Sequence, residues 1–253
     1  MISLVCLDMA GTTVHDGGVV VDAFRTALTD VGLEPGTAAH DHAVQYALDT
    51  MGQSKIAVFT ALFDGDTVRA EAANAAFERA YATTVGRGVR PVDGAVDVLE
   101  ALRASGTKVA LTTGFSPVTR DAVLDALGWQ DRVDLALSPA DAGRGRPFPD
   151  MVLTAVLRTQ TDDVRQVAVV GDTVADLLTG TRAGASIVAG VRTGTHQDAD
   201  FATVPHTHVL DSVADLPALL AGLDAAALGT DAPRADEPRA DEFSADEFSA
   251  VAR

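Results

Sequence analysis

The chain carries polar residues directly after two apolar runs, where a phosphate-like anion could be bound and attacked. The first run ends at Asp8, a carboxylate that could act as a nucleophile, hold a metal ion or cap the next turn. The second ends in Thr112-Thr113-Gly114, where a hydroxyl and backbone N–H groups at a helix start suit an anion. For either segment alone, helix capping explains the residues as well.

Two further segments could supply a cation and a guanidinium. Asp172 and Asp176 follow another apolar run, and two acids four residues apart at a strand-to-helix turn suit a hard cation such as Mg²⁺. Either acid alone would also complement the positive end of a helix. Arg146 precedes Pro147, the expected first residue of a helix, although a solvated loop arginine needs no function. Because the four segments together combine a nucleophile, a hydroxyl, a guanidinium and an acid pair, we predict one site for phosphoryl chemistry.

The apolar runs that carry these residues are expected to form a parallel β-sheet. The expected strands are 3–7, 108–112, 135–138, 167–170, 186–189 and 208–210, and helical patterns occupy 117–127, 147–159, 174–183 and 213–223. Apolar strands that alternate with helices are typical of a parallel sheet covered on both faces. This predicts an α/β, Rossmann-like doubly wound core, with ligands at the carboxyl ends of the strands.

Two regions depart from this alternation. Residues 19–88 hold four helical patterns and no convincing strand, which predicts a small all-helical cap inserted after the first strand. The catalytic core is then 1–18 and 89–228. Residues 229–253 repeat an acidic five-residue unit with few large apolar groups, and we expect this tail to be disordered.

Composition narrows the partners and the compartment. A formal charge of −17 argues against nucleic acid or anionic membrane, and no apolar run approaches the roughly 20 residues of a membrane span. The single cysteine, Cys6, fits a reducing compartment, and the first residues lack the basic region of a signal peptide. We therefore expect a cytoplasmic protein that binds a small metabolite.

In their order along the chain, the four segments resemble the motifs of the haloacid dehalogenase superfamily, over roughly residues 1–223. Three details are similar to its phosphonoacetaldehyde hydrolase (phosphonatase) branch. They are Asp8-Met9-Ala10-Gly11-Thr12-Thr13, Arg146 in place of the commoner lysine, and Met51-Gly52 followed by Lys55-Ile56 in the cap.

The resemblance implies a role for each matching residue. Asp8 would attack phosphorus and bind Mg²⁺ together with Asp172 and the backbone carbonyl of Ala10. Asp176 would order a metal-bound water or the arginine. Lys55 would form an imine with a substrate aldehyde. The remaining positions would bind the substrate or its phosphoryl oxygens: Thr12, Met51, Thr113, Gly114, Phe115 and Arg146.

Ala10 and Lys55 together distinguish two kinds of chemistry. Most phosphatases of the superfamily have a second Asp where this chain has Ala10, and losing such a general acid commonly costs ~10²–10⁴ in rate. A carbon leaving group next to an iminium needs no such acid, because the iminium accepts the electrons of the broken bond. Lys55 and Lys108 are the only lysines; Lys55 alone could also be a surface residue of an amphipathic helix. The combination favours cleavage of a carbon–phosphorus bond.

Three positions depart from the phosphonatase pattern around the organic part of the substrate. Val58 replaces a cap histidine, Gly18 falls near an expected cysteine, and Phe115 replaces an aromatic residue with a hydroxyl. The proton shuttle for imine formation is then missing or supplied elsewhere. His15, His40 and His42 are candidates, and each also fits an ordinary surface histidine. We infer a substrate other than phosphonoacetaldehyde itself, or slow turnover of it.

Three functions remain open from the sequence. The first is a Mg²⁺-dependent hydrolase of 2-oxoalkyl phosphonates that uses an imine at Lys55 and an aspartyl-phosphate at Asp8. The second is a phosphatase or phosphomutase of a small phosphate ester with the same Asp8 and no imine. The third is a non-catalytic sensor whose tail recruits a partner. The resemblance also implies that a homodimer could form through the cap helices.

Overall fold

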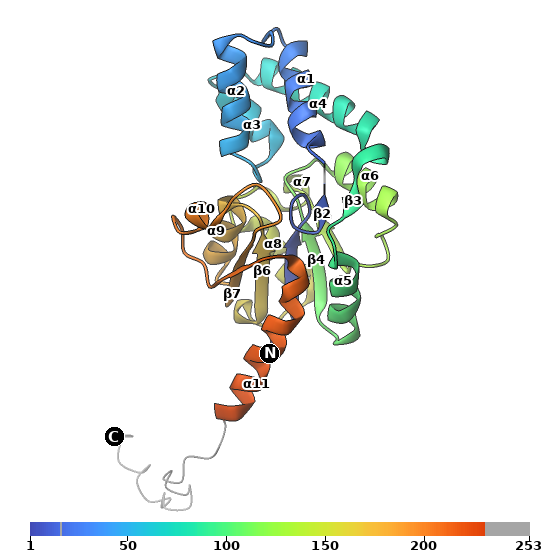
Figure 1. The fold of residues 1–253 in the computed structure, drawn as a ribbon, viewed down its shortest axis with the longest axis vertical. Coiled ribbons are helices and arrows are strands. Elements are labelled where there is room, and N and C mark those ends of the chain that lie inside the picture. The colour runs from blue at the N-terminus through green and yellow to red at the C-terminus, as the bar shows by residue number, and fades with distance from the viewer. Residues whose placement is uncertain (16, 231–253) are drawn as a thin grey trace, which may run out of the picture.

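A six-stranded parallel sheet forms the centre of the molecule (Figure 1). The computed structural model describes residues 1–15 and 17–230. The strands lie in the order β5-β4-β1-β6-β7-β8, and each neighbouring pair is parallel. Their bounds are β1 Leu4–Asp8, β4 Lys108–Thr112, β5 Leu135–Leu137, β6 Val167–Gly171, β7 Ile187–Val191 and β8 His208–Leu210. The predicted α/β core is thereby confirmed.

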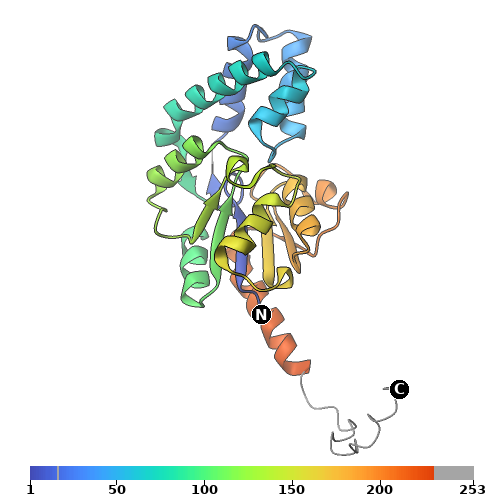
Figure 2. The same ribbon diagram turned by 180° about the vertical axis from the view of Figure 1, so that it is seen from behind.

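Helices cover both faces of this sheet (Figures 1 and 2). Leu4 and Cys6 of β1 pack into one apolar cluster, and Val5 and Leu7 pack into another on the opposite face. On the first face lie α8 (Asp150–Thr159) and α9 (Val174–Ala183), with the short α7 (Pro139–Ala142) and α10 (Asp198–Phe201) nearby. On the second lie α5 (Ala95–Ala104), α6 (Pro117–Leu127) and α11 (Leu216–Thr230). Successive side chains of a strand point to opposite faces of the sheet. Because they are apolar on both faces, both faces must be covered by helices.

Four helices form a cap beyond the carboxyl ends of the strands (Figure 1). They are α1 (Val19–Asp30), α2 (Ala38–Asp49), α3 (Lys55–Leu62) and α4 (Thr67–Gly88). Aromatic rings hold α1, α3 and α4 together: Phe24 stacks on Phe59 at 4.4 Å and meets Phe77 edge-on at 5.9 Å. The all-helical cap inserted after the first strand is as predicted.

The two chain segments that join cap and core pair with each other. β2 (Val14–His15) runs antiparallel to β3 (Arg90–Pro91), and the Val92 N–H donates to the Thr13 carbonyl at 2.9 Å. Two-residue strands have no detectable periodicity, so the sequence does not reveal this two-stranded pairing. It fixes the backbone of both linkers at the entrance to the cap.

Other differences concern helix ends. The helix expected from residue 147 begins at Asp150, because a turn closed by the Phe148 N–H and the Gly145 carbonyl comes first. The predicted helix 213–223 is a 3-10 turn followed by α11, which extends to Thr230 and so passes the expected start of the tail at residue 229. The rest of the predicted disordered tail lies outside the described residues.

No helix in the described part of the chain combines the length and apolar character that crossing a membrane requires. A cytoplasmic location and a dimer through the cap remain predictions.

Candidate active site

Three buried carboxylates meet at the carboxyl ends of two neighbouring strands. Asp8 ends β1, Asp172 follows β6, and Asp176 lies in the first turn of α9. One oxygen from each lies within 4.8 Å of the others. Because β1 and β6 pair directly, with Leu7 opposite Val170, their ends must meet at this edge of the sheet.

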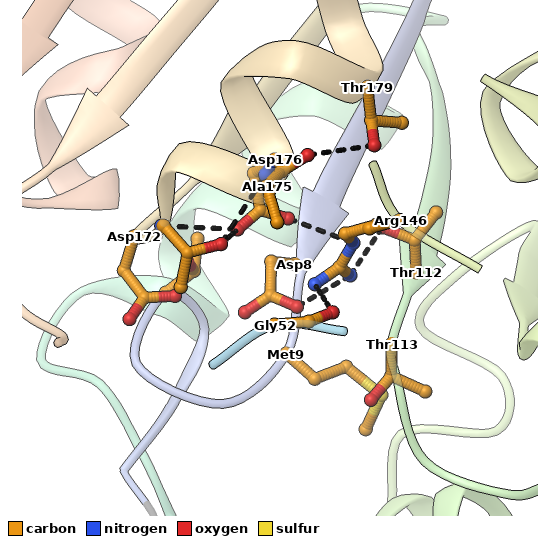
Figure 3. A network of polar contacts seen from close by, with 12 residues as sticks. Asp8, Met9, Gly52, Thr112, Thr113, Arg146, Asp172, Ala175, Asp176 and Thr179 are labelled. Atoms are coloured by element: carbon orange, nitrogen blue, oxygen red, sulfur yellow. Dashed lines mark hydrogen bonds and ion pairs between the residues drawn. The ribbon is translucent and has the colours of Figure 1, made fainter. Parts of the chain in front are cut away.

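Arg146 connects this cluster to the end of β4 and to the cap (Figure 3). Its Nη2 lies 2.6 Å from Asp8 Oδ1, and its Nε lies 2.9 Å from Asp176 Oδ1. Nη2 also donates to Thr112 Oγ1 at 3.0 Å, and Nη1 to the Gly52 carbonyl at 3.4 Å. The guanidinium is thus held by charge-assisted bonds on several sides, in the planar geometry that suits a phosphoryl group.

The protonation of the carboxyl groups is set mainly by burial. Burial raises the pKa of Asp8 to about 6, opposed by the charge of Arg146 and reinforced by the charge of Asp172. Burial also raises the pKa values of Asp172 and Asp176, and repulsion from Asp176 adds to the rise at Asp172. Three acids against one contacting arginine leave an excess of negative charge, which a divalent cation would balance.

The donor chemistry of the cluster fits Mg²⁺, which prefers carboxylate oxygens. Asp8 uses one oxygen for Arg146, whereas both oxygens of Asp176 are engaged, with Arg146 and with the Thr173 amide at 3.1 Å. Asp172 accepts the Thr195 N–H at 2.7 Å on Oδ2. Its Oδ1 accepts the Thr12 hydroxyl at 3.5 Å. Asp8 and Asp172 line the cavity and Asp176 does not, so the first two are the better-placed ligands and Asp176 is placed to orient the arginine.

Two glycines let the backbone approach Asp172 closely. A Cβ at Gly194 would lie 2.0 Å from Asp172 Oδ2, and one at Gly11 would lie 2.5 Å from it. Gly11 also has φ +90, a conformation that other residues rarely adopt. These loops enclose the carboxylate without covering it by side chains.

A cavity of about 270 Å³ opens from this cluster toward the cap. Lys55, the first residue of α3, is only 6% exposed and lines the cavity together with Asp8. Its Nζ lies 3.9 Å from Met51 Sδ and about 6 Å from the ring centres of Phe77 (6.0 Å) and Phe115 (5.9 Å). The amine of the cap and the carboxylate of the core thus share one enclosed space.

The cap loop before α3 is packed closely on the core. A Cβ at Gly52 would lie 2.5 Å from Thr173 Oγ1, and one at Gly114 would lie 2.5 Å from the Gln53 carbonyl. With no side chain on either glycine, the cap backbone rests directly on two core loops. At this loop the cap and the core are therefore in direct contact beside the cavity.

The structure brings most of the predicted site residues to this cavity. Those that line it are Asp8, Ala10, Met51, Lys55, Thr113, Gly114, Phe115, Arg146 and Asp172. Thr113 Oγ1 accepts the Phe115 N–H at 3.2 Å. Asp176 lies behind Arg146 rather than on the wall. Thr12, expected to bind substrate, does not reach the cavity: it is fully buried, and its hydroxyl faces Asp172 Oδ1 at 3.5 Å.

Of the three histidines considered for the proton shuttle, one lies at the cavity. His15 lines the cavity, whereas His40 is buried elsewhere in the cap and His42 is exposed. Val58 is buried in the apolar cluster that includes the cap interior. Gly18 lines the cavity.

Sequence reasoning missed several supporting groups. Thr112, opposite Asp8 in the sheet register, accepts from Arg146. Thr173 caps α9 and binds Asp176 through a capping box, a pattern that the Thr-x-x-Asp spacing could have revealed. The Thr195 amide and Thr193, which donates to the Gly11 carbonyl at 2.6 Å, lie in a loop after β7 without a motif.

Comparisons with known proteins identify the family. The family model for haloacid dehalogenase-like hydrolases matches residues 2–184. A phosphonoacetaldehyde hydrolase of Bacteroides fragilis is 34% identical over 138 residues, 54% of this chain and 51% of that protein, so the match spans about half the relative's length. A phosphonoacetaldehyde hydrolase of Parabacteroides distasonis is 28% identical over 215 residues, 78% of either chain.

Solved structures share the fold. A phosphonoacetaldehyde hydrolase-like protein from Oleispira antarctica has a TM-score of 0.75 at 22% identity, covering 94% of this chain and 96% of that one. A predicted phosphoglycolate phosphatase from Haemophilus somnus has a TM-score of 0.72 at 19% identity, covering 87% and 98%. At such identities the likeness concerns the fold and does not distinguish between substrates.

Proposed function

The chain belongs to the haloacid dehalogenase-like hydrolases, and within that family we propose that it cleaves the carbon–phosphorus bond of a 2-oxoalkyl phosphonate such as phosphonoacetaldehyde. The observation that carries the proposal is the position of Lys55, a buried amine of the cap on the same cavity as Asp8. Hydrolysis of a phosphate ester by Asp8 does not require an amine that can form an imine.

The phosphoryl group would bind at the sheet edge. Arg146, the Thr113 hydroxyl and the Gly114 N–H would hold its oxygens. Asp8, Asp172 and the Ala10 carbonyl would hold Mg²⁺, which when bound neutralises the excess negative charge and polarises a phosphoryl oxygen. With its pKa near 6, Asp8 is largely ionised at neutral pH and able to attack phosphorus.

The carbonyl end would react with Lys55. The amine adds to the carbonyl carbon and water leaves, which gives an iminium one bond from the carbon that carries phosphorus. When Asp8 attacks phosphorus, the electrons of the C–P bond move into the iminium and form an enamine. Water then hydrolyses the aspartyl-phosphate, and the enamine is protonated and hydrolysed to the aldehyde.

Ala10 supports this assignment over ester hydrolysis. It lines the cavity beside Asp8 and carries no proton to give to a leaving alkoxide. An enamine leaving group needs no proton at that step. A phosphatase or phosphomutase that uses Asp8 alone is the second candidate, and the experiment below separates the two.

Sodium borohydride tests the proposal by reducing the imine. With phosphonoacetaldehyde present, we expect wild-type protein to be inactivated and alkylated on the peptide that contains Lys55. Lys55→Arg should remove both the adduct and phosphate release, by about 10³-fold or more. Lys108→Arg is the matched control, because Lys108 is the only other lysine and lies exposed, paired with Asp134 at 3.2 Å. Turnover of phosphonoacetaldehyde that is insensitive to borohydride and to Lys55→Arg would exclude the imine. Phosphate release from small phosphate esters alone, unaffected by Lys55→Arg, would instead identify a phosphatase.

A further inference from the structure

A histidine of the linker between core and cap lines the cavity that holds Lys55. His15 belongs to β2 and is half-buried. The pairing of β2 with β3, where His15 lies opposite Arg90, fixes its backbone. Within residues 1–15 and 17–230, no hydrogen bond or ion pair occupies the His15 ring. The imidazole is thus a positioned group on the cavity wall, with no such contact from the part of the chain that the structure describes.

The other titratable side chains of the cavity wall have assigned tasks. Among the described residues these are Asp8, Asp172, Arg146 and Lys55. The two carboxylates and the arginine form the phosphoryl site, and Lys55 is the amine that attacks. An imidazole has one ring nitrogen that can accept a proton and one that can donate it, and His15 is the group of the cavity wall that these tasks leave unused.

The remaining histidines do not line the cavity. His196 accepts the Val174 N–H on Nδ1 at 2.9 Å and so caps α9. His40 and His42 belong to α2 and do not line the cavity. His206 and His208 accompany the edge strand β8.

We propose that His15 is the catalytic acid and base for imine formation at Lys55; this rests on the proposed function. The Lys55 amine forms a bond to the carbonyl carbon, and the carbonyl electrons move to oxygen. His15 takes a proton from the nitrogen and gives it to that oxygen, which yields a neutral carbinolamine. His15, protonated again from solvent, then donates to the hydroxyl group. The C–O bond breaks, water leaves, and the nitrogen lone pair completes the iminium.

The step needs help because hydroxide is a poor leaving group. General acid–base catalysis of such a proton transfer is worth about 10²–10⁴ in rate. The phosphoryl transfer by Asp8 needs no proton from His15, so the two reactions should respond differently to its loss.

His15→Gln tests the proposal against His42→Gln, an exposed histidine of the cap. The rate of borohydride trapping with phosphonoacetaldehyde is measured beside hydrolysis of p-nitrophenyl phosphate, which uses Asp8 but no imine. We expect His15→Gln to slow trapping by about 100-fold or more relative to its effect on p-nitrophenyl phosphate. His42→Gln should leave both rates within about twofold of wild type. Added imidazole should restore trapping in His15→Gly, which a purely structural role would not allow.

Two outcomes overturn the assignment in distinguishable ways. If wild type and His15→Gln are trapped equally fast, or if both reactions fall together without rescue by imidazole, His15 does not transfer protons. If wild-type protein forms no adduct with any 2-oxoalkyl phosphonate, the imine itself is absent and the proposed function fails with it.

Discussion

The two halves of the cavity are built differently. The phosphoryl half, formed by Asp8, Arg146, Asp172 and Asp176, is buried, charged and connected by short polar contacts. The cap half, formed by Met51, Lys55 and Phe115 with Val20 and Leu48, is mostly apolar and carries one amine. In the first half each position is constrained by several partners, whereas in the second half the constraint is mainly shape.

This difference explains where the chain departs from the phosphonatase pattern. Val58, Gly18 and Phe115 belong to the cap or face it, and none touches the carboxylates. A network of charged bonds fails when one partner is removed, but an apolar wall tolerates changes of side chain. We therefore expect the phosphoryl half to determine that a reaction occurs and the cap half to determine on which substrate.

Asp8→Asn should produce the largest effect because it removes the nucleophile common to all substrates. We expect phosphate release from both phosphonoacetaldehyde and p-nitrophenyl phosphate to fall by about 10⁴-fold or more. Borohydride trapping of Lys55 should persist, since imine formation does not need Asp8. Loss of trapping together with turnover would mean that the two halves are not separable.

Arg146→Lys should reduce turnover of both substrates by about 10²-fold. A lysine can replace neither the simultaneous contacts to Asp8 and Asp176 nor the planar donor geometry. The matched control is Arg144→Lys, two residues away, where an exposed arginine pairs with Asp150 at 2.8 Å. Steady-state kinetics on both substrates measure the loss; a defect confined to the aldehyde substrate would contradict the division of the cavity.

Much of the phosphoryl half could be predicted from sequence because apolar runs define where strands end. Asp8 and Asp172 follow from that rule and lie where expected. Arg146 does not, because it lies well beyond the end of β5; it was predicted from Pro147 and from the family resemblance. Thr12 does not lie where expected, because the turn after β1 returns to the Met9 carbonyl, which accepts the Thr12 N–H at 3.2 Å, and the side chain is buried. A turn of this kind leaves no periodic signal.

The cap half was less predictable. Helical patterns located the cap, but no pattern tells which of three histidines reaches the cavity, since that depends on how the cap and the core meet. His15 is held at the cavity by the pairing of β2 with β3, and these strands are too short to be predicted from the sequence. The Thr195 amide, likewise, contacts Asp172 only through tertiary folding.

Stability should depend on pH and Mg²⁺ through the phosphoryl half. The folded-state pKa of Asp8 is raised from 3.8 to about 6, so folding binds the proton more tightly. This contribution is fully present below about pH 4 and is lost as pH rises through about 6, on the order of 2 kcal/mol. With a chelator, the Tm should therefore fall between pH 5 and pH 7, by several degrees.

Mg²⁺ should reverse that fall, because a bound cation balances the ionised carboxylates, and its stabilisation should be larger at pH 7 than at pH 5. Asp8→Asn is the control, since it removes one of the three carboxyl groups with raised pKa values and leaves Asp172 and Asp176 in place. Its Tm in chelator should change less between these pH values than that of wild type. A wild-type Tm that rises over this range relative to Asp8→Asn would contradict the assigned pKa shift.

Met51→Leu should give the smallest effect and test whether the cap half acts through more than shape. The thioether Sδ lies 3.9 Å from Lys55 Nζ, a weak contact that leucine cannot make although it fills nearly the same volume. We expect aldehyde turnover to fall by about threefold, and p-nitrophenyl phosphate hydrolysis to stay unchanged. Met151→Leu controls for the general cost of replacing a buried methionine. Met151 belongs to α8, is fully buried and does not line the cavity. If Met51→Leu lowers both activities equally, the cap half also positions the phosphoryl group, and substrate choice is not confined to it.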